Sequence, residues 1–236
     1  MRSANRVVVL VMNRLREKIR PGVTTLDLDR MAYEAILKEG SKPAFKGYRG
    51  FNHTLCISVN EEVVHGIPSA KRVLQAGDLV SIDCGVLKED FYGDHAVTFP
   101  VGSMDEKSQR LLEVTKESLH LGIQEMQPGK RLGDISAAVQ EHVEKHGFSV
   151  VRDFVGHGVG RALHEEPQLP NFGKRNTGLR LKPGLVLAIE PMVNVGTFEV
   201  ETLSDGWTVV TKDRKRSAHF EHSVAITENG PDILSK

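Results

Sequence analysis

The sequence predicts an α+β fold whose two halves repeat each other. Three observations support this prediction. Segments with the helical spacing of apolar residues alternate with short strand-like runs along the 236 residues. A shift of the chain by 107 positions brings similar residues together in two separated stretches. No low-complexity stretch or linker interrupts the chain, so we expect a single domain over residues 1–236, with halves of roughly 1–107 and 108–236.

The first half is expected to begin with two helices. Residues 1–20 carry apolar side chains at helical spacing, and the segment ends before Pro21. A second helix covers about 25–38, where Thr25 or Asp27 can cap its first turn. Three strand-like runs follow, at 54–59, 78–83 and 95–101.

The second half has the same order of elements. Two helices are expected at about 105–126 and 133–146. Strands are expected near 148–155, 185–190, 208–211 and 219–227. Helices followed by strands in both halves give the α+β class.

The internal repeat relates strand ends as well as helices. At the offset of 107, Asp27 lies on Asp134, and Asp83 lies on Glu190 much further along. Coincidence is the alternative, since Pro and Gly are common at helix ends, but one offset at two separated stretches favours duplication. A duplicated fold would bring Asp83 and Glu190 together across a pseudo-twofold axis. A site between the halves is therefore expected.

Composition and charge argue against several classes of function. Lys plus Arg number 31 and Asp plus Glu also number 31, so no overall field attracts nucleic acid or an anionic membrane. Only Cys56 and Cys84 occur, too few for a disulfide scaffold. The apolar run from Val7 to Met12 is too short for a signal peptide or a membrane span. We therefore expect a cytoplasmic protein without a nucleic-acid substrate or a membrane anchor.

Carboxylates at strand ends and one histidine among glycines form a candidate metal site. Asp83 and Asp94 flank a probable hairpin, and His157 lies in a glycine-rich turn. Glu190 ends an apolar run, and Glu221 lies inside a strand pattern. Each alone also fits a turn cap, a surface charge or a structural ion pair. Together they form an oxygen-rich set for two divalent ions of the Co, Mn, Fe or Zn kind, which is typical of hydrolases.

Other patterns give weaker indications. The turn at 156–160 lacks the spacing of a dinucleotide-binding loop, and no G-x-S-x-G sequence is present. His142 and His146 have i, i+4 spacing on a helix but no third ligand pattern in the sequence, so we interpret them as a solvated face. Neither cysteine has a nearby partner pattern for covalent catalysis.

Nine short stretches, taken together, resemble the type I methionine aminopeptidases of the pita-bread fold over essentially the whole chain. They are Cys56 to Asn60, Val64 to Pro68, Ser81 to Asp83, Tyr92 to Asp94, Gly156 to Gly160, His164 to Pro167, Ile189 to Val193, Asp205 to Thr208 and Phe220 to His222. Their order and spacing are specific. The resemblance implies two pseudo-twofold-related halves around a central antiparallel sheet. It also implies an enzyme that removes the initiator methionine from nascent proteins when the second residue is small.

The resemblance also implies roles for individual residues. Two divalent metal ions would be held by Asp83, Asp94, His157, Glu190 and Glu221, with Asp94 and Glu221 bridging. His65 and His164 would contact the scissile peptide, with His164 steadying the oxyanion, and Glu190 would move a proton. The substrate would be bound by His65, Tyr48, Phe51, Cys56, Leu163, His164, Trp207 and His219. Phe45 stands at a pocket position that varies among relatives.

The same resemblance leaves two alternative functions open and also bears on the partners of the protein. Aminopeptidase P and prolidase share the five ligands but usually carry an added N-terminal domain, for which this chain is short. Pita-bread proteins that have lost their ligands act as binding modules, whereas all five ligand positions are intact here. Some relatives have a lysine-rich loop at 195–205 thought to dock on the ribosome; Glu199 and Glu201 stand there instead. A transient ribosome contact and a monomeric state are expected. The family motif that begins here at Met1 usually follows further residues.

Overall fold

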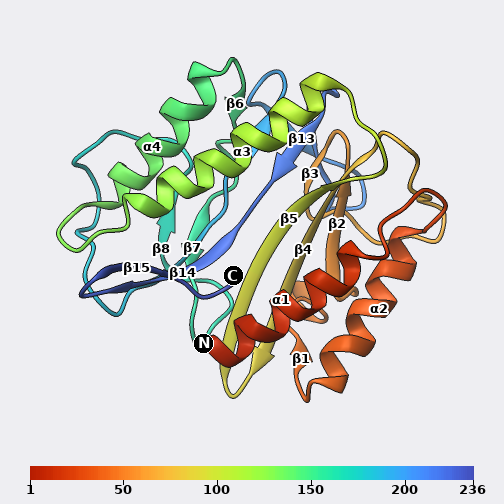
Figure 1. Ribbon diagram of the computed structural model, residues 1–236, viewed down its shortest axis with the longest axis horizontal. Helices are drawn as coiled ribbons and strands as arrows, with labels where there is room; N and C mark the ends of the chain where they lie inside the picture. The colour runs from red at the N-terminus through yellow and green to blue at the C-terminus, as the bar shows by residue number, and fades with distance from the viewer.

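The computed structural model describes residues 1–236 and shows four helices packed on one side of a curved set of antiparallel sheets (Figure 1). The first half contains α1 (Arg2–Arg16), α2 (Thr25–Lys38), β1 (Lys42–Pro43), the 3₁₀ turn η1 (Tyr48–Gly50), β2 (Leu55–Val59), β3 (Glu62–Val64), β4 (Leu79–Lys88) and β5 (Phe91–Pro100). The second half begins with α3 (Glu106–Gln124), α4 (Leu132–Lys145), β6 (Ser149–Val150), β7 (Gly156–Gly158) and β8 (Glu165–Leu169). It continues with β9 (Val186–Ile189), β10 (Met192–Asn194), β11 (Val200–Thr202), β12 (Val209–Thr211), β13 (Ser217–His219), β14 (His222–Thr227) and β15 (Gly230–Ile233).

The helices lie close to where the sequence places them, with two differences. α1 ends at Arg16 rather than near residue 20. Thr24, not Thr25 or Asp27, is the N-cap of α2: its hydroxyl accepts from the backbone N–H of Asp27, and the Asp27 carboxylate accepts from the backbone N–H of Thr24. The prediction chose the wrong cap because this reciprocal capping box begins one residue earlier than the apolar periodicity shows.

The strands form one long hairpin and several shorter ladders. β4 and β5 pair antiparallel over ten residue pairs, and β4 also pairs with β1 and β2. The second half holds a five-stranded sheet in the order β15-β14-β9-β7-β8. Two three-stranded sheets complete the fold, in the orders β13-β10-β6 and β11-β12-β3. The expected strand at 148–155 is shortened to β6, because residues 151–155 form a loop. The expected strand at 219–227 is divided between β13 and β14, because Phe220-Glu221 leaves the ladder.

Elements in the two halves match at the offset seen in the sequence. α2 and α4 are both 14 residues long and start at Thr25 and Leu132. Gly77 and Gly184 both have φ +93°, a left-handed conformation that favours glycine, and each precedes a matching strand. The isolated bridges Thr24–Val73 and Arg131–Arg180 also differ by the same offset. The division of the chain into halves at residue 107 remains our interpretation.

Two hydrophobic cores lie beneath the helices, one in each half. The first contains 18 buried residues, mainly from α1, α2, β2 and β4, and the second contains 21, mainly from α3, α4 and the second-half strands. Val97 on β5 packs against both cores. The halves meet where β5 runs beside β14: the Glu221 N–H donates to the Ala96 carbonyl at 2.8 Å. This seam is where the candidate site forms.

The two chain ends also lie side by side (Figure 1). Arg2 at the start of α1 forms an ion pair with Asp232 on β15, so the last strand of the chain is tied to the first helix. No helix of the structure is both long enough and apolar enough to cross a membrane.

Candidate active site

The long hairpin presents two carboxylates on one face. In the β4–β5 register Asp94 lies opposite Gly85, and Asp83 lies two residues before Gly85 on the same strand. Residues two apart in a strand point to the same side, so Asp83 and Asp94 are diagonal neighbours on one face. The predicted polar turn forms at Glu89-Asp90, both with positive φ. The hairpin thus brings the first two sequence-predicted ligands together.

His157 reaches the same place from the second half, on β7. Its flanking residues must be glycine, because a Cβ on Gly156 would lie 2.4 Å from the Ala188 carbonyl oxygen and one on Gly158 would lie 2.4 Å from that of Glu166. The Nδ1 of His157 lies 2.9 Å from the Gly158 carbonyl oxygen and is thereby assigned as the protonated nitrogen. Nε2 is left free to face the carboxylates.

Glu190 and Glu221 complete the set of five candidate metal ligands. Glu190 directly follows β9, and Glu221 directly precedes β14. The Glu190 carboxylate lies 3.4 Å from Nε2 of His157 and 3.4 Å from Nε2 of His219. Donor atoms of Asp94, His157 and Glu221 all lie within 4.8 Å of one another. The five residues that the sequence singles out as ligands therefore converge.

The buried carboxylates of this group would be stabilised by bound cations. Burial raises the pKa of Asp83 to about 7 and of Glu190 to about 7, and burial with neighbouring carboxylates raises the pKa of Asp94 and Glu221 well above the usual range. Only histidines lie within ion-pair distance of these carboxylates. One oxygen each of Asp83, Asp94 and Glu221 is buried without a hydrogen-bond partner. Buried, unpaired carboxylate oxygens are costly, and divalent ions would satisfy them, so the residues fit a metal centre.

These carboxylates form the floor of a cavity of about 630 Å³ between the two halves. Every residue to which the sequence assigns a role at the site lines this cavity: Tyr48, Phe51, Cys56, His65, Asp83, Asp94, His157, Leu163, His164, Glu190, Trp207, His219 and Glu221. None of the predicted residues lies elsewhere. Their placement agrees with the sequence, whereas the individual roles remain proposals.

One end of the cavity is apolar and contains sulfur. Phe45, Phe51, Cys56 and Leu163 form a buried cluster, and Trp207 packs against it with its ring 5.0 Å from that of Phe51. Cys56 pairs across strands with Asp83, so the thiol stands beside the carboxylates. Burial raises the pKa of this thiol well above its usual value, so it stays neutral. The pocket can hold an unbranched, polarisable side chain next to the metal ligands.

Gly85 makes room for the wall of this pocket. A Cβ on Gly85 would lie 2.5 Å from a ring carbon of Phe45. Because Gly85 has no side chain, the Phe45 ring can lie against β4 at this point. Phe45 occupies the variable pocket position noted in the sequence.

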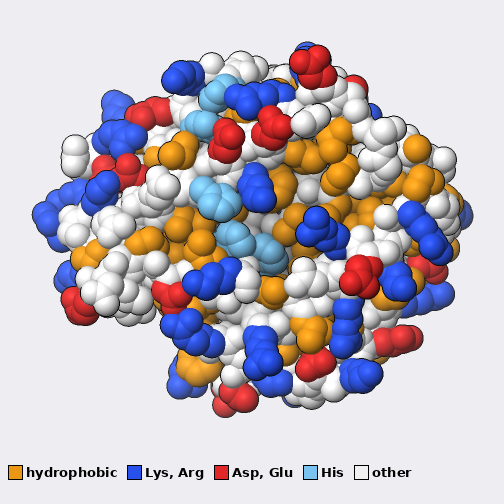
Figure 2. Space-filling view, viewed as in Figure 1, with side chains coloured by type: hydrophobic (Ala, Val, Ile, Leu, Met, Phe, Trp, Pro, Cys, Tyr) orange, Lys and Arg blue, Asp and Glu red, His pale blue; other side chains and the backbone are white.

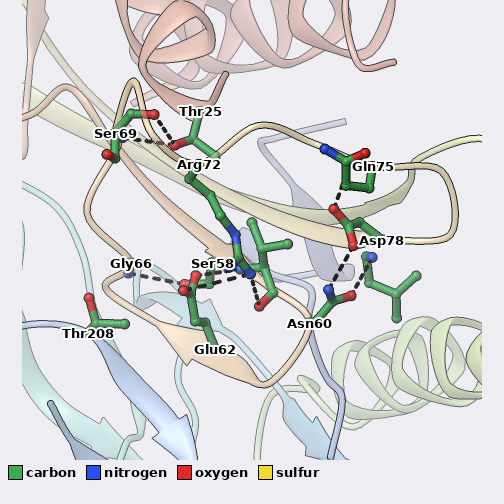
Figure 3. A network of polar contacts seen from close by, with 12 residues as sticks. Thr25, Ser58, Asn60, Glu62, Gly66, Ser69, Arg72, Gln75, Asp78 and Thr208 are labelled. Atoms are coloured by element: carbon green, nitrogen blue, oxygen red, sulfur yellow. Dashed lines mark hydrogen bonds and ion pairs between the residues drawn. The ribbon is translucent and has the colours of Figure 1, made fainter. Parts of the chain in front are cut away.

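His65 directly follows β3 and precedes Gly66, which belongs to the polar network drawn in Figure 3. His65 has φ +60°, an uncommon backbone conformation for a residue with a side chain. The Gly66 N–H donates to the Ser58 hydroxyl at 3.1 Å, and a Cβ on Gly66 would lie 2.2 Å from the Ile57 carbonyl oxygen. Glu62 accepts from the Val59 N–H at 2.7 Å. Burial lowers the pKa of His65 to about 4, so this imidazole is neutral near pH 7.

Figure 3 also shows how the network continues to Arg72. Its guanidinium donates to the Val59 carbonyl at 3.3 Å and lies 4.0 Å from the Glu62 carboxylate. The turn from β2 to β3 is thus tied to the loop that enters β4. These contacts fix the direction in which His65 enters the cavity.

His164 approaches the metal ligands from the opposite rim. Its Nδ1 lies 2.9 Å from the Tyr48 hydroxyl, and its ring centre lies 4.3 Å from that of His157. Burial and the charges of His157, Arg49 and His65 lower the pKa of His164 to about 4. A neutral imidazole with one nitrogen facing the cavity can donate or accept one proton there.

Sequence reasoning missed several residues that line the cavity. Phe154 packs edge-on against His65, with ring centres 5.4 Å apart, and Met192 lies two residues beyond Glu190. Asp153, Glu165 and Glu166 also line the cavity. Proximity in sequence to His157 and Glu190 is the signal that could have identified Phe154 and Met192.

Comparisons with known proteins agree with this geometry. The model of metallopeptidase family M24 matches residues 1–228. The chain is 56% identical over 236 residues to methionine aminopeptidase 1 of Bacillus subtilis and 54% identical over 235 residues to a methionine aminopeptidase of Clostridium perfringens. Each alignment covers 100% of this chain, with 95% of the first relative and 94% of the second.

Among solved structures, the chain is again similar to a methionine aminopeptidase. The crystal structure of a methionine aminopeptidase from Thermotoga maritima superimposes with TM-score 0.99 at 50% identity, covering 100% of this chain and 95% of that one. A prolidase from Pyrococcus furiosus shares the fold alone, with TM-score 0.81 at 24% identity, and this chain covers 62% of it.

Proposed function

The chain belongs to metallopeptidase family M24, and we propose that it is a metalloaminopeptidase that removes the initiator methionine from nascent proteins and peptides. The expected substrate is an N-terminal peptide with a small second residue. The expected cofactor is a pair of divalent ions of the Co, Mn, Fe or Zn kind. One observation carries the proposal: a sulfur-containing apolar pocket opens directly onto a group of buried, unpaired carboxylates.

The pocket explains the choice of methionine. Phe45, Phe51 and Leu163 surround an apolar space, and the Cys56 thiol lies on the side nearest Asp83. A thioether gains favourable contacts with aromatic rings and with other polarisable groups. With the side chain in this pocket, the substrate's free amino group would lie beside the carboxylates, which attract a cation.

Different residues of the chain would have different roles in the hydrolysis. Two divalent ions held by Asp83, Asp94, His157, Glu190 and Glu221 would polarise the scissile carbonyl and activate water as a nucleophile. Glu190, which lies between His157 and His219, accepts the proton of the attacking water and passes it to the leaving amine. His164 donates to the oxygen on which negative charge develops, and His65 contacts the peptide on the other rim.

A proline-specific activity is the second candidate, since prolidases share the fold. Proline at the second position would place a ring near the scissile bond. The observation that favours methionine is the apolar character of the first-residue pocket, where Trp207 packs against Phe51.

The decisive measurement is release of free amino acid from Met-Ala-Ser and from a matched Xaa-Pro peptide, with the protein first freed of metal and then restored. We expect methionine release that vanishes on chelation and returns with two ions per chain. Full activity after chelation excludes the metal mechanism. Faster cleavage of the Xaa-Pro peptide than of Met-Ala-Ser excludes the methionine assignment.

Cytoplasmic location, a monomeric state and a transient ribosome contact complete the proposal. Cotranslational removal of methionine places the substrate at the exit of the ribosome. The segment 195–205 has no Lys or Arg to attract RNA, and its Glu199 and Glu201 pair with Lys212 and Arg214. Sedimentation of the protein with and without ribosomes tests both the state and the contact.

A further inference from the structure

A second group of metal-ligating side chains lies on the helical face, away from the catalytic cavity. A groove of about 500 Å³ between α3 and α4 is lined by Glu113, Lys116, Glu117, His120, Leu121 and His142. None of these residues lines the catalytic cavity. Figure 2 shows histidine side chains in a row on this face, beginning in the region of α3 and α4 beside acidic and basic groups.

The groove supplies the third ligand that the sequence pattern lacked. The sequence alone places His142 and His146 on a solvated face of α4, because no third ligand pattern accompanies them. In the structure the His142 Nε2 lies 3.0 Å from the Glu117 carboxylate of α3. Glu117 and His120 have i, i+3 spacing, which places both side chains on one face of α3. Two helices therefore bring a carboxylate and two imidazoles to the same groove.

Each of the two imidazoles in the groove has a nitrogen that can bind a metal ion. His120 Nδ1 lies 2.8 Å from the Lys116 carbonyl oxygen, so Nδ1–H is assigned as the donor of this hydrogen bond and Nε2 keeps its lone pair. His142 is partly buried, and burial together with His146 lowers its pKa, which favours the neutral imidazole. Neutral imidazole nitrogens and a carboxylate are common ligands of zinc and its neighbours.

One neighbour opposes cation binding. Lys116 lines the groove with its ammonium group, whereas Glu113 and Glu117 carry two negative charges there. The three ligand atoms do not yet lie within mutual bonding range, since only Asp94, His157 and Glu221 do so in this chain. His120 is exposed, and its ring lies 6.3 Å from that of His222, so it must leave its contact with the Lys116 carbonyl to join the Glu117–His142 pair. A site of moderate affinity is therefore expected.

We propose that the groove between α3 and α4 is a second divalent-cation site, in which Glu117, His120 and His142 hold an ion of the Zn, Co or Ni kind. The ion replaces the proton shared between His142 and Glu117. The remaining coordination positions face solvent, so water completes the shell. This site is independent of the proposed peptidase function.

The test counts bound Zn²⁺ by equilibrium dialysis of the full chain. Wild type should bind one Zn²⁺ ion that Glu117→Gln and His142→Gln either do not bind or bind at least about tenfold more weakly. Loss of an outer-shell partner alone lowers metal affinity about 10–100-fold, so loss of a direct ligand should cost at least as much. Glu144→Gln is the matched control: it removes one charge from α4 at a residue that pairs with Gln140 outside the groove. Lys116→Gln should tighten binding.

The outcomes separate the possibilities clearly. Equal zinc counts and affinities in wild type, Glu117→Gln and His142→Gln overturn the proposal, as does an equal loss in Glu144→Gln. Nuclear magnetic resonance of the wild-type imidazoles provides a measurement that needs no variant: zinc should shift the signals of His120 and His142. Unchanged signals at zinc excess also overturn it. Methionine release by the metal-loaded Glu117→Gln variant should equal that of wild type, so failure here leaves the catalytic proposal untouched.

Discussion

The contact between Tyr48 and His164 leads to a prediction about the tautomer of a catalytic histidine. To donate to the oxyanion, His164 must carry its proton on Nε2, so Nδ1 must accept a hydrogen bond. Nδ1 lies 2.9 Å from the Tyr48 hydroxyl, which can donate. Tyr48→Phe removes that donor and keeps the ring. The imidazole then loses the partner that fixes its useful tautomer.

The expected sizes of the two effects differ. Loss of one preorganised oxyanion donor costs about 10²–10³ in kcat, so His164→Ala should fall by that factor. Loss of one ordinary hydrogen bond costs about 0.5–1.5 kcal/mol, which predicts a decrease of roughly two- to tenfold for Tyr48→Phe. Because Tyr48 acts through His164, the double variant should be no slower than His164→Ala alone.

Steady-state kinetics on Met-Ala-Ser, with metal content measured for each variant, checks this reasoning. Both single variants should keep two ions per chain and change KM far less than kcat. A loss of metal in His164→Ala, or a loss below about threefold in kcat, would mean a structural turn histidine. If Tyr48→Phe slowed the His164→Ala enzyme by the same factor as wild type, the two residues would act separately and the tautomer argument would fail.

Three further predictions concern the ligands, the substrate and the stability of the fold. Asp94→Asn should lower activity and metal content more than Asp83→Asn, because a bridging carboxylate serves both ions; equal, mild effects on metal content would contradict the bridging role. Met-Gly-X peptides should give a much higher kcat/KM than Met-Leu-X peptides, and comparable values would contradict a tight wall at the second residue. Asp134→Asn should destabilise the protein by about 1 kcal/mol at pH 7, because the carboxylate accepts from the backbone N–H groups of Asn176 and Arg131. These bonds lower the pKa of Asp134, so its contribution is present above the unfolded pKa of about 3.9 and disappears as the pH falls through the lower folded value. Urea unfolding of both proteins at pH 7 and near pH 3 should show the difference shrink, and a constant difference would refute it.

Much of the fold could be predicted because local patterns and tertiary structure agree. The helices near 25–38 and 133–146 were predicted within a residue or so, since apolar periodicity and stop signals coincide there. The hairpin turn between Asp83 and Asp94 was predicted from its polar residues and forms at Glu89-Asp90. Short strands such as β7 and β13 were not, because three-residue ladders depend on partners that are distant in sequence.

At the site, too, features that are local in the sequence could be predicted, whereas contacts between residues far apart in the chain could not. Ligand types and strand-end positions are visible in the sequence, so the convergence of Asp83, His157 and Glu190 was predicted. The Tyr48–His164 contact joins residues 116 positions apart, and the Glu117–His142 contact joins residues 25 apart on different helices. Such pairs follow from the packing of elements, which a single sequence does not encode in any local pattern.

The repeat also explains why the cavity has two different ends. At the offset of 107, Cys56 corresponds to Leu163 and Asp83 corresponds to Glu190, and both members of each pair line the cavity. We infer that the cavity lies on the axis that relates the halves, because only there do equivalent positions face one another. His157, by contrast, corresponds to Gly50, which does not line the cavity. One pair therefore contributes to the apolar wall and the other to the carboxylate floor, whereas His157 has only a glycine as its counterpart, so the floor is not symmetric.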